Sequence, residues 1–75
     1  MYWKDFLTKR GLFDTLRMGE IIESRGETTL AALIPDLREQ GRDAEWKENY
    51  LLSVVGILES LKVVELSDNK VLWIS

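Results

Sequence analysis

The clearest pattern of apolar and polar positions lies in the last third of the chain. Apolar residues recur there every three or four positions, which places them on one side of a helix: Trp46, Tyr50, Leu51, Val54, Val55, Leu58 and Leu61. Asp43 is a good N-cap, and the charge of Glu45 suits the first turn. The spacing therefore predicts a helix that begins after Asp43 and ends near Leu61 or Lys62.

The residues after this helix predict a β-hairpin. Val63–Leu66 contains β-branched residues that favour a strand, and Val71–Ile74 has a similar character. Ser67–Lys70 separates the two segments, and its Asp68 and Asn69 tolerate the left-handed backbone of a tight turn. We therefore expect a long helix followed closely by two short strands.

A further helix is predicted in the middle of the chain. Apolar side chains follow helical spacing at Leu30, Leu33, Ile34 and Leu37. A threonine just before them is the expected N-cap, Gly26 should end the preceding helix, and Gly41 should end this one. Pro35 leaves two alternatives open: the helix bends at this residue, or it begins there.

The N-terminal third does not fit one straight helix facing one core. At helical spacing, Leu12, Phe13 and Leu16 gather on one side, whereas Met18, Ile21 and Ile22 lie on roughly the opposite side. We favour a break near Gly11 or Gly19. The alternative is a helix that buries two sides, one in its own core and one against another chain.

Helix, helix, helix and hairpin, in this order, follow the plan of a winged helix-turn-helix domain. We expect a single domain over residues 1–75, mainly α, with three or four helices followed by a two-stranded C-terminal wing. Asn49–Glu65 followed by Lys70–Ile74 resembles the recognition helix and wing of DP and E-two-F type transcription factors. The shared features are an apolar helix ending in a Leu-Glu-like step, two β-branched residues, a polar turn, and a strand ending in Trp and an aliphatic residue.

This resemblance implies the fold, and with it DNA binding in transcription control. One departure concerns the site itself. Those factors carry a pair of arginines that read base edges where this chain has Asn49 and Tyr50. The base-reading chemistry of the family is therefore not carried over to these two positions.

The composition excludes several kinds of functional site. The 75 residues include no Cys and no His, which excludes disulfides and thiolate metal sites and removes the commonest general base. We expect no enzymatic activity, no cofactor, no metal site and no small-molecule substrate. No apolar run is long enough to span a membrane. These features favour the cytoplasm, or the nucleus in a eukaryote.

The charge balance counts against strong DNA binding, although the architecture favours it. The net charge is −3, and residues 36–49 hold three bases against five acids, whereas phosphate neutralisation supplies much of the affinity for DNA. In a winged helix, the outward side of the third helix and the wing tip contact DNA. The candidate nucleic-acid-binding residues are therefore Arg38, Arg42, Lys47, Asn49, Ser53 and Lys70.

Two functions remain open: a DNA-binding transcription regulator, which the architecture favours, and an acidic protein-interaction module, either an adaptor or an inhibitor. We also expect a homodimer. Candidate partner-interface residues are Trp3, Phe6 and Leu52; Trp73 is expected in the core and Trp46 half exposed. Lys9, Arg10 and Arg17 form the densest basic cluster, which we interpret as a solubilising helix face.

Overall fold

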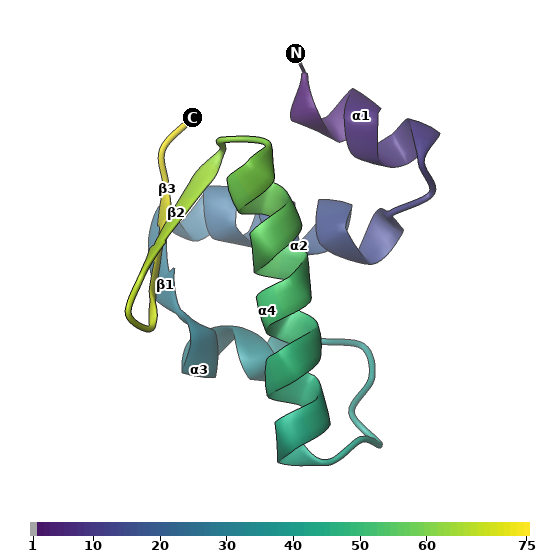
Figure 1. Ribbon diagram of the computed structural model, residues 1–75, viewed down its shortest axis with the longest axis vertical. Helices are drawn as coiled ribbons and strands as arrows, with labels where there is room; N and C mark the ends of the chain where they lie inside the picture. The colour runs from purple at the N-terminus through teal and green to yellow at the C-terminus, as the bar shows by residue number, and fades with distance from the viewer. Residues whose placement is uncertain (1) are drawn as a thin grey trace.

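The computed structural model describes residues 2–75, in which one long helix, α4, crosses in front of α2 and flanks a small sheet (Figure 1). The elements in chain order are α1 (Trp3–Lys9), α2 (Phe13–Arg25), β1 (Glu27–Thr29), α3 (Leu30–Leu33), the 3₁₀ turn η1 (Ile34–Asp36), α4 (Ala44–Ser60), β2 (Val64–Ser67) and β3 (Lys70–Trp73). The three strands form one antiparallel sheet in the order β1-β3-β2. The chain is thus mainly helical with a small sheet.

The predicted long helix and hairpin are confirmed. The Asp43 carboxylate accepts a 2.7 Å hydrogen bond from the backbone N–H of Trp46, which caps α4 as expected. After α4 ends at Ser60, Lys62 adopts a positive φ of 63° and turns the chain into β2. The strands are shifted by one residue from their predicted bounds, but the turn between them falls where it was expected.

The sheet has three strands, so the expectation of a two-stranded wing was wrong. Glu27–Thr29 pairs with β3, with Glu27 opposite Leu72 and Thr29 opposite Lys70. Gly26 makes this possible, because its φ of 77° ends α2 and redirects the chain into the sheet. A strand of three residues is too short to produce a readable alternation of apolar and polar side chains.

Helix α3 is much shorter than its apolar spacing predicted. The threonine cap is confirmed: Thr29 accepts a hydrogen bond from the N–H of Ala32. The α-helix then ends at Leu33 and gives way to η1, because Pro35 has no N–H to continue the ladder. The expectation that Gly41 ends this helix was therefore wrong. The side-chain amide of Gln40 donates to the carbonyls of Ile34, Pro35 and Leu37, so these carbonyls at the end of η1 have hydrogen-bond partners.

Of the two readings of the N-terminal third, the break is confirmed, and it lies at Gly11. Gly11 has a φ of 69° and separates α1 from α2. Helix α2 then runs through Gly19 without interruption. Its buried positions are Thr15, Met18, Gly19 and Ile22, while Phe13 is 60% exposed.

Trp3 anchors α1 to the rest of the core. It is 6% exposed, and its ring meets that of Trp73 edge-on with 5.2 Å between centroids. The ring also occupies the space over Gly19: a Cβ at Gly19 would lie 2.6 Å from Cζ3 of Trp3. The expectation that Trp3 faces a partner was therefore wrong, because a large aromatic ring in so small a chain is needed to fill the core.

Gly19→Ala should lower the free energy of unfolding by about 1–3 kcal/mol, because the added methyl group overpacks the contact with the Trp3 ring. The better helix propensity of alanine offsets up to about 1 kcal/mol of this loss. Urea unfolding measures the change. In a Trp3→Leu background the loss should be smaller, because the contact with the Trp3 ring is removed and only the 3.1 Å approach to Cδ2 of Leu58 remains. An equal loss in both backgrounds would contradict the packing of Trp3 on Gly19.

Candidate interaction surface

The exposed side of α4 carries carboxylates around one leucine. Helix α4 buries Leu51, Val54, Val55 and Leu58 against α2 and the sheet, so the opposite side faces outward. The exposed residues on that outward side are Glu45, Glu48, Asn49, Leu52, Ser53, Glu59 and Ser60. Leu52 is 38% exposed. Among the residues that the structure describes, this side of α4 contains three carboxylates and no Lys or Arg.

A groove lies beside this surface, between α3, α4 and the turn of the hairpin. Its lining residues are Leu30, Ala31, Ile34, Glu48 and Asn69. The backbone N–H of Leu30 donates to the carbonyl of Asn69 at 2.9 Å, which fixes the hairpin turn against the start of α3. Glu48 also precedes Leu52 by one helical turn, so the groove and the exposed side of α4 are continuous. We call the two together the α4 surface.

The hairpin turn adds polar groups at the edge of the α4 surface. Asp68 adopts a positive φ of 56°, and a hollow at the turn is lined by Thr29, Ser67, Asp68, Asn69 and Lys70. Lys70 Nζ lies 3.8 Å from a carboxylate oxygen of Glu27 across the sheet. The base expected at the wing tip therefore has an acidic neighbour on β1.

An aromatic stack borders the other flank of α4. Trp46 and Tyr50 stack with 5.0 Å between ring centroids and 11° between planes, and the Arg42 guanidinium lies 4.7 Å from the centre of the Trp46 ring. Trp46 is half-buried, as expected. The positive charge of Arg42 is therefore held over an indole next to the start of the helix.

Tyr50 connects this stack to α2. Its hydroxyl donates a 2.8 Å hydrogen bond to the carboxylate of Asp14, whose other oxygen lies 4.0 Å from Nε of Arg38. Burial, followed by the hydrogen bond and the negative charge of Asp14, raises the pKa of Tyr50. The hydrogen bond to Asp14 thus requires the neutral form of this hydroxyl.

The structure does not bring the six expected nucleic-acid-binding residues together. Asn49 and Ser53 share the exposed side of α4, where the Ser53 hydroxyl donates to the Asn49 carbonyl at 3.2 Å. Lys47 is half-buried on another side, because two residues of helix leave it about 160° from Asn49 around the axis. Arg38, Arg42 and Lys70 lie beside Asp14, Trp46 and Glu27, respectively.

The three expected partner-interface residues also separate. Leu52 lies on the α4 surface, whereas Trp3 is in the core. Phe6 is half-buried, with the Arg10 guanidinium 3.6 Å from the centre of its ring. Sequence reasoning missed the groove residues Ala31 and Asn69, since their proximity depends on the pairing of β1 with β3.

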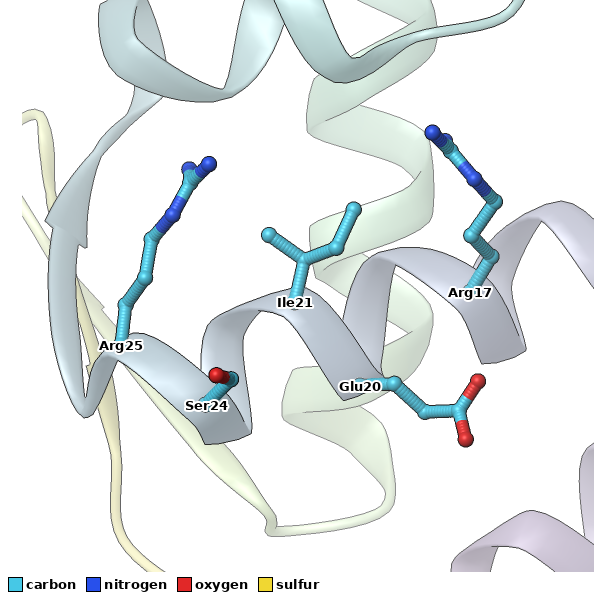
Figure 2. A pocket seen from close by; sticks show the side chains of 5 residues that line it. All are labelled: Arg17, Glu20, Ile21, Ser24 and Arg25. Carbon is cyan, nitrogen blue, oxygen red and sulfur yellow. The ribbon is translucent and has the colours of Figure 1, made fainter.

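A second hollow lies along α2 and has a structural explanation. Figure 2 shows Arg17, Ile21 and Arg25 projecting from α2 in one direction, with Glu20 and Ser24 beside them. Arg17 donates to the carbonyl of Asp36, and Nη2 of Arg25 lies 2.9 Å from the Asp36 carboxylate. Both guanidinium groups therefore fasten η1 to α2.

In comparisons with known proteins, no protein-family model, no curated protein and no solved structure matches this chain. No helix within residues 2–75 has the length and apolar character required to cross a membrane. In the same residues, no three acidic, His or Cys side chains are grouped so as to hold a metal ion.

The raised pKa of Tyr50 predicts a pH dependence of stability. Because the pKa is higher in the folded state, the neutral hydroxyl stabilises the fold below the unfolded-state pKa, and this contribution is lost as the pH rises above about 10. The difference in free energy of unfolding between the wild type and Tyr50→Phe should therefore shrink above that pH. Urea unfolding from pH 8 to about pH 11 measures it.

Tyr2→Phe, at the exposed Tyr2, is the control for the loss of one hydroxyl group. Parallel stability curves for the wild type and Tyr50→Phe would contradict a hydrogen bond between Tyr50 and Asp14.

Proposed function

We propose that this chain is a protein-binding module of the winged-helix type, and that it binds its partner through the α4 surface. Three features support the architecture. Helices α2, α3 and α4 follow one another, the β2-β3 hairpin comes directly after α4, and that hairpin packs against α4 and α2. In such a scaffold α4 occupies the place of the recognition helix. Its exposed side then decides what kind of partner is bound.

The observation that carries the proposal is the charge of that side. Glu45, Glu48 and Glu59 surround Leu52, and the described part of the chain places no base among them. Duplex DNA carries one negative charge per about 1.7 Å of its axis, so a DNA-binding face needs bases to neutralise phosphates. A carboxylate brought within about 4 Å of a phosphate would instead be repelled by about 1–4 kcal/mol. The α4 surface therefore favours protein over DNA.

The remaining groups on the α4 surface suit a protein interface. Leu52 supplies an apolar centre, and Asn49 and Ser53 supply hydrogen-bonding groups beside it, which is the usual arrangement of a hydrophobic centre and a polar rim. Gly56 lies one turn after Leu52, and the space where its side chain would stand is open. A partner backbone can approach the helix closely at this point.

A random dodecapeptide library displayed on phage tests the proposal. Peptides selected on the wild-type chain should bind Leu52→Gln at least about tenfold more weakly, because loss of an interface centre costs more than about 1.4 kcal/mol. Leu72→Gln is the matched control, since Leu72 on the outer side of the sheet is 39% exposed against 38% for Leu52. Fluorescence anisotropy of the selected peptides measures the affinities.

A random 20-base-pair duplex is the competing ligand in the same assay. We expect no binding of DNA even at low salt. Binding that falls steeply as salt is raised and weakens on Asn49→Ala would contradict the proposal. So would a set of selected peptides whose affinity Leu52→Gln leaves unchanged.

A further inference from the structure

We infer that the partner segment bound by the α4 surface is basic, and that it inserts one bulky apolar side chain into the groove between α3, α4 and the hairpin turn. This inference rests on the proposed function and specifies the chemistry of the partner. It follows from two properties of the groove, an apolar floor and an acidic rim.

The floor of the groove fits a single side chain. The lining residues here are the core residue Leu30, the partly buried Ile34 that packs against the core, and the exposed Ala31. The groove has a volume of about 200 Å³, which is below the range of roughly 300–1,000 Å³ of pockets for drug-sized ligands. An aliphatic or aromatic side chain from a longer segment is therefore a better occupant than a free small molecule.

The rim of the groove determines the charge of the segment. Glu48 stands on the α4 side, and Asn69 stands on the hairpin side next to Asp68. Glu45 lies one turn before Glu48 on the same side of the helix. Glu48 is the one carboxylate among the lining residues, and Asp68 and Lys70 flank Asn69 at the hairpin turn, so a segment that fills the groove passes directly beside Glu48.

Within the described part of the chain, none of these carboxylates takes part in an ion pair. Within residues 2–75 the ion pairs use the acids Asp14, Glu20, Glu23, Glu27 and Asp36, none of which belongs to α4 or to the hairpin turn. Lys or Arg residues beside the apolar anchor would supply the missing positive charge, whereas an acidic segment would be repelled. Charge complementarity thus identifies a basic segment as the occupant.

Three labelled 12-residue peptides test the inference. Each has one central leucine, and the flanking residues are lysine, glutamine or glutamate. The lysine peptide should bind the wild type most tightly and the glutamate peptide most weakly, as measured by fluorescence anisotropy. Replacing the leucine of the lysine peptide with glycine should weaken binding about tenfold or more, since no bulky apolar side chain would then be buried in the groove.

Two pairs of matched variants locate the binding. Ala31→Gln obstructs the groove and should weaken binding of the lysine peptide, whereas Ala32→Gln, at the exposed neighbouring alanine outside the groove, should not. Glu48→Gln should weaken it about two- to fivefold and reduce its salt dependence, as expected for one exposed ion pair. Glu65→Gln, at an exposed glutamate on β2, is the control and should have no effect.

The outcomes separate this inference from the proposed function. Equal binding of the lysine and glutamine peptides, or equal binding of the lysine peptide to Ala31→Gln and Ala32→Gln, would overturn the inference. Phage-selected peptides that depend on Leu52 would still support the proposed function in either case. Self-association of the chain that is lost in Ala31→Gln and kept in Ala32→Gln would overturn it in favour of a second copy as the occupant.

Discussion

The structure depends on the burial of one side of α4. A chain of 75 residues without cysteine or histidine has no disulfide to support it, so its stability rests on packing. Leu51, Val55 and Leu58 are completely buried, and α4 contacts both α2 and the sheet. This burial fixes the rotation of α4 about its axis. The outward position of Leu52 and of the three glutamates on α4 follows directly.

The pairing of β1 with β3 adds a second constraint, which gives the α4 surface its groove. β1 leads straight into α3, so the register of Thr29 opposite Lys70 sets where α3 begins relative to the hairpin turn. The hydrogen bond from Leu30 to Asn69 closes that junction. A packed helix and a paired strand thus position side chains from three separate parts of the chain around one hollow.

The sequence was most informative where a regular pattern is long. Seven apolar positions and a capping aspartate predicted α4, and the polar turn predicted the hairpin. Strand β1 escaped prediction because it has three residues and is held by partners far along the chain. The length of α3 was overestimated because its apolar spacing continues through Ile34 and Leu37, although Pro35 prevents the α-helical ladder from continuing there.

In the candidate site too, features set by nearby residues could be predicted from the sequence, whereas features set by distant residues could not. Leu52 and the acidic character of its surroundings were evident from helical spacing alone. The burial of Trp3 was not, because it depends on the absence of a side chain at Gly19 and on the ring of Trp73. The position of Lys47 on another side of α4 follows from helical spacing and could have been predicted, whereas the position of Lys70 beside Glu27 depends on the pairing of β1 with β3.

The antiparallel register that places Glu27 opposite Leu72 also has a kinetic consequence. This contact joins segments remote in sequence, and closing so large a loop costs entropy before any strand hydrogen bond is gained. During synthesis, β1 therefore waits for β3 to leave the ribosome, and an isolated N-terminal half has no strand with which to pair. The groove, which needs β1 held beside β3, is consequently complete only in a polypeptide that contains both segments.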